Sequence, residues 1–386
     1  MKLAVIGASY LQVPLIQRAR EMGHETWAFA WAAGDPGERA SDHFVPISIV
    51  EKDAILARCR EIGADGVCTI ASDLAAVTAG YVAHGMGLPC NPPEAVLAAS
   101  NKRVMRRAFE AGGDPSPRSL PVSGPEDTEG IDFSWPVIVK PLDRSGSRGI
   151  TRVERAEELP AAIEAALSQG FEKTALVEEF APGREYSVEG LSWEGRHTIL
   201  TVTEKYTTGA PGFIETGHME PAGLSPEAEE KIRSVVVHAL DSLGVRLGAS
   251  HAEVKIDGEG RVRIIEIGAR MGGDLIGSHL VPLTTGFDYL GDVIRCALDQ
   301  EPEAPRGIRS RTPVSPAAAV RFVFSPEDLR ALETLKRTHP EYLLAEETRP
   351  LSGERVTDSS SRFGYFLMAG PSRDALAPLM PPQGRE

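Results

Sequence analysis

Short apolar runs alternate with helix-like segments over the first 95 residues, and this alternation limits the possible folds more than any other feature of the chain. The apolar run 2–8 ends in glycine, and residues 11–24 then show helical periodicity. A later apolar run is followed by two polar residues, Ser72 and Asp73, which would lie at the carboxyl end of a strand. Consecutive strand–helix units predict a doubly wound parallel sheet. Ligands of such sheets bind at the carboxyl ends of the strands, so this domain is a candidate contributor to a substrate pocket.

The first turn of this domain argues against a dinucleotide site. Its sequence, GASYLQ, has Ser9 and Gln12 at the second and third glycine positions of the GxGxxG fingerprint. An NAD-dependent dehydrogenase is therefore disfavoured.

Composition narrows the class of partner. The net charge of −14 argues against nucleic acid and anionic membranes, because both require a concentrated basic surface. The 4 cysteines have no CxxC spacing, which is typical of a reducing compartment. No apolar run approaches the roughly 20 residues of a membrane helix. We expect a cytoplasmic protein.

A strand-end lysine precedes a glycine–serine loop. Lys140 closes the apolar run PVIVK, and a lysine tip in that setting needs an anion or a carboxylate partner. The loop 143–149 offers small residues and exposed backbone N–H groups that can form an anion nest. Its small residues are Ser145, Gly146, Ser147 and Gly149. Lysine and loop together predict a phosphate site, against the alternative of an ordinary hairpin tip.

The segment LVEEFAPGREYSV has carboxylates at both ends of a turn. Glu178 and Glu179 end one strand, and Glu185 begins the next. Such a segment can hold an adenine through its backbone and a ribose through a carboxylate. Taken alone, it is more typical of a hairpin with solvated glutamates.

Two carboxylates lie within apolar strands. Glu253 and Glu266 interrupt the runs SHAEVKI and IIEIG, and the turn IDGEG between them predicts that the strands pair. Like charges side by side are costly unless a cation lies between them. Magnesium fits, because it is commonly held by one or two carboxylates and nucleotide phosphates. Arg270, four residues after Glu266, is expected at the same site, where it can neutralise a transferring phosphoryl group. The alternative is a buried structural Glu–Arg pair.

Taken in order, these segments resemble the ATP-grasp ligases over roughly residues 95–300. In that resemblance Lys102 and Lys140 are the two nucleotide lysines, and RSGSRGI is the lid loop over the phosphates. The resemblance also implies nucleotide contacts from Glu178, Glu179, Phe180 (through its backbone) and Glu185, and a magnesium pair of Glu253 and Glu266. One departure is Gly268, where many members have an asparagine on the second metal. The implied cofactors are ATP and Mg²⁺, with Mn²⁺ as an alternative.

The resemblance implies an α/β architecture: an ATP-grasp fold behind an N-terminal doubly wound parallel-sheet domain. The expected parts are an N-terminal domain (1–95), a linker helix with a Pro-rich connection (96–120), a lid subdomain (121–190), a mixed-sheet catalytic subdomain (191–305) and a small C-terminal α+β domain (306–386). Homodimers are common in the family, although no interface can be identified in the sequence.

The implied reaction joins a small-molecule carboxylate to an amine through an acyl phosphate, releasing ADP and phosphate. Residues 213–225 and 269–289 are similar to the substrate segments of the L-amino-acid (dipeptide) ligase branch, so an amino acid is the expected substrate. His218, in a glycine-flanked loop, is expected to orient substrate or move a proton, and Arg270 is expected to contact the reacting groups. The expected substrate contacts continue through Met271, Gly272, Gly273 and Asp274, with Asp274 open to an ammonium group. A purine precursor, bicarbonate, or nucleotide binding without turnover remain the alternatives.

Overall fold

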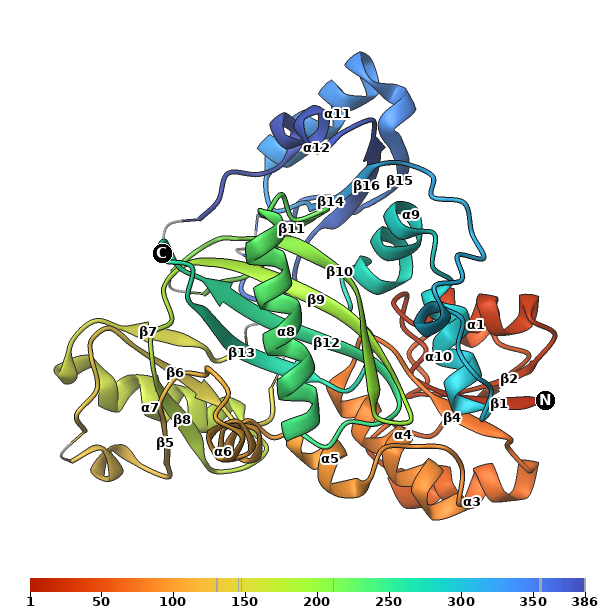
Figure 1. Cartoon of the computed structure of the whole chain (residues 1–386), viewed down its shortest axis with the longest axis horizontal. Helices are drawn as coiled ribbons and strands as arrows, with labels where there is room; N and C mark the ends of the chain where they lie inside the picture. Colours follow the sequence, from red (N-terminus) through yellow and green to blue (C-terminus); the bar gives the residue numbers. More distant parts are fainter. Residues whose placement is uncertain (130, 145, 147, 211, 354–355, 385–386) are drawn as a thin grey trace.

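The computed structural model describes residues 1–129, 131–144, 146, 148–210, 212–353 and 356–384. Within these residues the strands form three sheets. In Figure 1 the N-terminal sheet lies at the lower right, a small sheet at the lower left, and a large sheet rises through the centre to the C-terminal strands at the top.

The N-terminal sheet is parallel, as predicted, with the strand order β3-β2-β1-β4. Its elements are β1 (Lys2–Ile6), α1 (Val13–Glu21), β2 (Glu25–Phe29), α2 (Pro36–Ala40), β3 (His43–Val45), α3 (Lys52–Ile62), β4 (Gly66–Cys68) and α4 (Asp73–Met86). Both faces of β1 are buried, because Leu3 and Val5 pack with residues of α1 and of α10 (Tyr289–Ala297), whereas Ala4 and Ile6 pack with α3 and α4. A helix from late in the chain therefore completes the N-terminal core.

The turn after β1 is filled by the side chain of Gln12. Its amide donates to the carbonyl of Ile70 at 2.8 Å and accepts from the backbone N–H of Ser9 at 3.1 Å. A Cβ at Gly7 would lie 3.0 Å from the amide carbon of Gln12. The glycine therefore leaves room for this side chain beside the strand.

The small sheet has the order β5-β8-β6-β7 and is antiparallel in every described pairing. Its elements are β5 (Ser119–Val122), β6 (Val137–Pro141), β7 (Thr151–Val153), α7 (Leu159–Gln169) and β8 (Ala175–Glu179). Ile163 and Ala166 of α7 pack on Val137 and Val139 of β6, which covers one face of the sheet.

The large sheet has the order β13-β12-β9-β10-β11-β14-β16-β15. Its strands are β9 (Arg184–Trp193), β10 (Arg196–Thr207), β11 (Glu215–Glu220), β12 (Gly248–Ile256), β13 (Val262–Gly268), β14 (Ala317–Phe322), β15 (Leu343–Thr348) and β16 (Gly364–Gly370). Every described pairing is antiparallel, which corrects the expected mixed sheet. Short turns join β9 to β10 and β12 to β13, and such tight connections require antiparallel neighbours.

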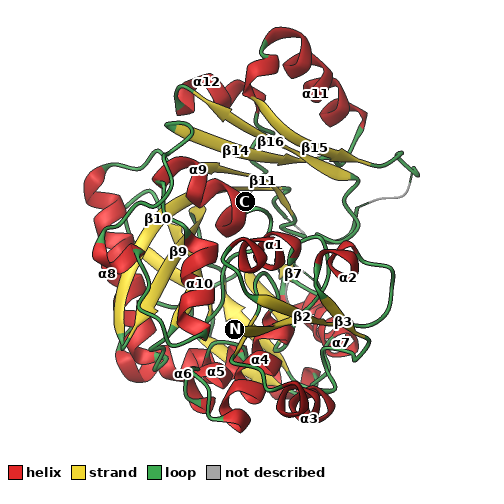
Figure 2. Ribbon diagram, turned by 90° about the vertical axis from the view of Figure 1, so that its right-hand side faces the viewer, coloured by secondary structure: helices red, strands yellow, loops and turns green. Residues whose placement is uncertain are grey.

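The C-terminal strands continue the large sheet, because β14 pairs with β11. The predicted domain boundaries stay a prediction. Figure 2 shows the C-terminal helices α11 (Pro326–Thr338) and α12 (Arg373–Leu376) on the outer side of these strands. The remaining α-helices are α5 (Pro93–Ala98), α6 (Lys102–Gly112), α8 (Pro226–Ser242), α9 (Val281–Thr285), α11 (Pro326–Thr338) and α12 (Arg373–Leu376). The short 3-10 helices are η1 (Pro125–Thr128), η2 (Ala156–Glu158), η4 (Ala304–Arg306), η5 (Pro340–Tyr342) and η6 (Ala377–Leu379), and η3 (Ile276–Leu280) is a short π-helix. Among the described helices, none is long and apolar enough to cross a membrane.

Candidate active site

The two strand carboxylates lie side by side, as the sequence predicts. Glu253 on β12 is in register with Glu266 on β13, and both side chains are 24% exposed. Each carboxylate also contacts its own lysine: Glu253 lies 3.0 Å from Lys205 Nζ, and Glu266 lies 2.8 Å from Lys102 Nζ. Lys102 reaches this point because α6 begins there, capped by the side chain of Asn101.

The donor set fits magnesium that is shared with a nucleotide. Two hard carboxylate oxygens face one cavity, and the described residues contain no cluster of three or more His, Cys, Asp or Glu side chains that would enclose an ion alone. Magnesium is usually held by one or two carboxylates, with phosphates and water completing its octahedron. Glu253 and Glu266 are therefore the residues that would hold it.

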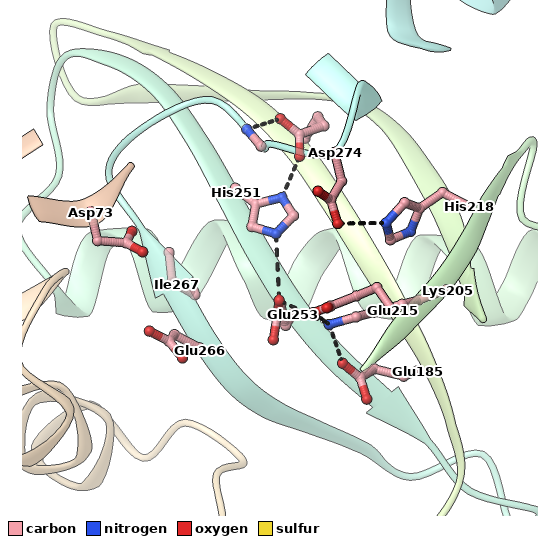
Figure 3. A network of polar contacts seen from close by, with 12 residues as sticks. Asp73, Glu185, Lys205, Glu215, His218, His251, Glu253, Glu266, Ile267 and Asp274 are labelled. Atoms are coloured by element: carbon pink, nitrogen blue, oxygen red, sulfur yellow. Dashed lines mark hydrogen bonds and ion pairs between the residues drawn. The ribbon is translucent and has the colours of Figure 1, made fainter. Parts of the chain in front are cut away.

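Lys205, on β10, is a residue that the sequence analysis missed. Its ammonium lies 2.7 Å from Glu185, 3.0 Å from Glu253 and 3.3 Å from Glu215 (Figure 3). Burial disfavours its charge, but the three carboxylates outweigh burial and hold the pKa of Lys205 well above its usual value. The only sequence signal was a charged Glu204–Lys205 pair within an otherwise apolar and threonine-rich strand.

His251 links Glu253 to a buried carboxylate. Its Nδ1 contacts Glu189. Its Nε2 lies 3.6 Å from Glu253 (Figure 3). Burial disfavours the imidazolium, but Glu189 outweighs it and raises the pKa of His251 to about 9. Glu189 also accepts from the backbone N–H of Gly272 at 2.9 Å. Burial opposes ionisation of Glu253 as well, yet Lys205 and His251 hold the pKa of its carboxyl well below the usual range.

Lys140, next to last in β6, forms a buried triad with Glu178 and Arg106. Lys140 Nζ lies 2.7 Å from Glu178 Oε2, and Arg106 Nε lies 2.8 Å from Glu178 Oε1. Both oxygens of Glu178 contact cations, so in this structure the carboxylate is a counter-ion of Arg106 and Lys140, and its predicted nucleotide contact stays a prediction. The physical reason is register: Glu178 pairs with Ile138 in the centre of the small sheet and is only 3% exposed. Burial lowers the pKa of Lys140.

A cavity of about 150 Å³ lies between the small and the large sheet. Its lining brings together most of the predicted nucleotide residues: Lys102, Lys140, Gly146, Glu178, Glu179, Phe180, Glu185, Glu253 and Glu266. The ring of Phe180 lies 4.8 Å from Lys255 Nζ, while its backbone N–H donates to the Pro136 carbonyl at 3.3 Å. Glu179 lies 3.5 Å from Arg118.

The predicted phosphate loop is only partly placed at the cavity. Ser145 and Ser147 lie outside the described residues. Gly146 has φ +68° and lines the cavity. A Cβ at Gly149 would instead lie 2.9 Å from Pro141 Cγ, so packing against the strand end accounts for that glycine.

Arg270 stands where the nucleotide cavity meets a larger one of about 490 Å³. Its Nε donates to Asp73 Oδ1 at 2.7 Å and its Nη2 to Asp73 Oδ2 at 3.1 Å. Burial opposes both charges, but the pairing raises the pKa of Arg270 and lowers that of Asp73. Asp73, one of the two polar residues predicted to follow the strand, thus reaches the site. The sequence did not predict Arg270 as its partner.

The larger cavity holds His218, but not in the predicted loop. His218 lies on β11, is 1% exposed, and its Nε2 is 3.6 Å from Asp274 Oδ2 (Figure 3). The neighbouring Gly217 was the reason to predict a loop. A Cβ there would lie 2.7 Å from the carbonyl oxygen of Val320 on β14, so the glycine instead allows the two strands to pack closely.

The expected substrate run after Arg270 is divided between the larger cavity, which Gly273 and Asp274 line, and the core, where Met271 lies. Asp274 is not open to an ammonium group, because Arg362 binds both of its oxygens at 2.6 and 2.9 Å. The Met271 side chain is 0% exposed in the core, and a Cβ on Gly272 would lie 2.4 Å from Glu189 Oε1. These two residues therefore serve packing. Gly273 does line the larger cavity.

Comparison with known proteins agrees with this geometry. Residues 133–278 match the model of the ATP-grasp domain. The chain contains an ATP-grasp domain. It is 28% identical over 282 residues to carnosine synthase 1 of Mus musculus, covering 67% of this chain and 34% of that protein. It is 31% identical over 199 residues to a D-alanine–D-alanine ligase of Aromatoleum aromaticum (strain DSM 19018 / LMG 30748 / EbN1), covering 50% of this chain and 63% of that protein.

A solved structure shares the fold over nearly its whole length. The L-amino acid ligase from Bacillus licheniformis aligns with a TM-score of 0.82 at 24% identity, covering 98% of this chain and 95% of that one. The resemblance to ATP-grasp ligases and the predicted ATP-grasp fold are confirmed. The chain spans about a third of the length of the carnosine synthases that it matches.

Proposed function

We propose that the protein is an ATP-dependent carboxylate–amine ligase that activates an amino acid as an acyl phosphate and releases ADP and phosphate. The observation that carries this proposal is the placement of Arg270 where the two cavities meet, beside the opposed carboxylates Glu253 and Glu266. The names of the similar proteins support ligase chemistry, two of them with amino acids as substrates.

The nucleotide cavity supplies the groups that an ATP needs. Lys102 and Lys140 line this cavity and are our proposed phosphate ligands, and Phe180, which lines it as well, is our proposed adenine contact. Magnesium held by Glu253 and Glu266 would supply charge neutralisation of the phosphate oxygens. Lys205 and His251 hold Glu253 ionised, so this carboxylate is ready to bind a cation at neutral pH.

The transfer step places a substrate carboxylate in the larger cavity. A carboxylate oxygen attacks the γ-phosphorus, the bond to the β-phosphate oxygen breaks, and ADP leaves. Arg270 borders both cavities, so its guanidinium offsets the charge that develops between them. Its partner Asp73 already occupies Nε, which fixes the plane of the group.

The second step forms the amide. An amine attacks the acyl carbon, phosphate leaves, and the nitrogen loses a proton. His218 is our proposed acceptor of that proton, because it lines the larger cavity, where its Nε2 lies 3.6 Å from Asp274 Oδ2. The C-terminal residues Glu347 and Tyr365 line the same cavity, so the end of the chain is proposed to close it. A cytoplasmic location and a homodimer stay predictions.

Product analysis tests the proposal. The protein is incubated with magnesium, ATP and a pool of amino acids, and then with pools that omit single members. We expect ADP and phosphate only when amino acids are present, and the omissions identify the substrates. The matched control, Glu266→Gln, should abolish this turnover.

Two other outcomes would contradict the proposal. AMP and pyrophosphate would mean adenylation rather than an acyl phosphate. No turnover with any amino acid would redirect the search to purine precursors or bicarbonate, or to a role in binding without turnover.

A further inference from the structure

The N-terminal domain contacts the end of β13 at several neighbouring points. The backbone N–H of Ala71 donates to the Met271 carbonyl at 3.1 Å, and a Cβ at Gly273 would lie 3.3 Å from Ala71 Cβ. Asp73 follows at once and binds Arg270 through two hydrogen bonds. Figure 3 shows Asp73 on a separate N-terminal segment beside the strands that carry Glu253 and Glu266.

Gly268 provides the space for this contact. A Cβ at Gly268 would lie 3.1 Å from Asp73 Oδ1 and 3.4 Å from Arg270 Nε. A longer side chain at this position would overlap the carboxylate. The glycine that departs from the expected asparagine is therefore matched to Asp73.

We infer that Asp73 is a positioning residue for Arg270 in the reaction, and that Gly268 is the residue that admits it. The Asp73 carboxylate accepts hydrogen bonds from Nε–H and from one Nη2–H of the Arg270 guanidinium. A guanidinium has five N–H donors, so further donors stay available to an anion in either cavity. Both charged groups line the two cavities, which places this ion pair beside the reacting groups. The inference rests on the proposed function for its kinetic part only.

The kinetic test compares Asp73→Asn with a matched ion pair elsewhere between the same parts of the chain. Asp288 binds Arg18 of α1 at 2.6 Å, is 2% exposed, and does not belong to the described lining of either cavity. Because small misplacements of a catalytic group are costly, we expect Asp73→Asn to lower kcat/KM for the carboxylate substrate roughly tenfold to a hundredfold. Calorimetric binding of magnesium and a non-hydrolysable ATP analogue should stay within about threefold of wild type.

Asp288→Asn should reduce the melting temperature but leave kcat/KM within about threefold of wild type. Equal kinetic losses in the two variants would show that Asp73 acts only as structural support between domains, and would overturn the inference. A loss confined to nucleotide binding would overturn it as well.

A stability cycle tests the geometry without any assay of turnover. Gly268→Asn should lower the melting temperature, and the double variant Gly268→Asn/Asp73→Ala should lose less than the sum of the two single variants. Additive losses would show that Gly268 and Asp73 do not share this space. If wild type forms no ADP with amino acids, the proposed function fails, while this cycle still decides the positional claim.

Discussion

Replacing Lys205 with methionine should reverse the direction in which pH changes the contribution of this site to the free energy of unfolding. The ammonium of Lys205 is the shared partner of three carboxylates, at 2.7 Å from Glu185, 3.0 Å from Glu253 and 3.3 Å from Glu215. Methionine fills a similar volume but carries no charge. The variant therefore buries the three carboxylates without their common cation.

The magnitude follows from burial and charge. Lys205 is 5% exposed, and removing one partner of a buried ion pair typically costs about 3–5 kcal/mol because the other charge is left uncompensated. In wild type the pKa of Glu253 lies well below its usual value of 4.5, so its contribution to stability is present above that pH and is lost as pH falls. In the variant, burial of Glu253 is no longer offset by Lys205, so the pKa of its carboxyl rises, and protonation then stabilises the folded state as pH falls.

Urea denaturation of both proteins at pH 5, 6, 7 and 8 measures this effect. The difference in unfolding free energy between wild type and variant should grow with pH, by at most about 1.4 kcal/mol per pH unit for each proton taken up. Taking the difference cancels groups that both proteins share.

The matched control is Lys336→Met. Lys336 also bridges two glutamates, at 2.8 Å from Glu346 and 3.1 Å from Glu333, but its side chain is 35% exposed. We expect a loss within about 1 kcal/mol, with little dependence on pH. A Lys205→Met loss as small as this control, or a difference that shrinks as pH rises, would refute the reasoning.

Three further substitutions test other parts of the site. Glu266→Gln should abolish ADP formation while circular dichroism shows an intact fold; near-normal phosphate release would remove the magnesium assignment. Arg270→Ala should raise the barrier to ADP formation by about 3 kcal/mol, and a loss of less than tenfold in steady-state kcat/KM would make it a structural arginine. Glu220 is fully buried, and burial raises its pKa to about 8, so the carboxyl is protonated at neutral pH and its stabilising effect is lost as pH rises through about 8. Glu220→Gln should therefore flatten the dependence of stability on pH between about 4.5 and 8 relative to wild type, as thermal melts at several pH values would reveal.

Local patterns predicted the parallel N-terminal sheet and helix α1, because short-range periodicity identifies such elements, but they did not predict helices α2 and α4. They also predicted the opposition of Glu253 and Glu266, since a tight turn between two strands determines which residues face each other. These features depend on neighbours within a few residues in the chain, where the sequence is informative.

The partners of the site residues could not be predicted in this way. Arg362 lies 88 residues from Asp274 in the chain, and their contact depends on how the C-terminal strands extend the large sheet. Lys205 is on β10 and Glu253 is on β12, the two strands that flank β9. The two side chains meet because they lie on the same face of the large sheet. Strand order is a property of the whole fold, and periodicity does not encode it.

Asp73 shows most clearly why a local rule is insufficient. Serine and aspartate both favour the start of a helix, so Ser72 and Asp73 together are fully explained by helix α4 if only the sequence is considered. The structure separates their roles: the Ser72 hydroxyl accepts the capping hydrogen bond from the backbone N–H of Ala75, while the Asp73 carboxylate binds Arg270. Because the Ser72 hydroxyl already makes the cap, the Asp73 carboxylate is available for a contact 197 residues away. The close approach at Gly268 is the independent sign that this contact shapes the site.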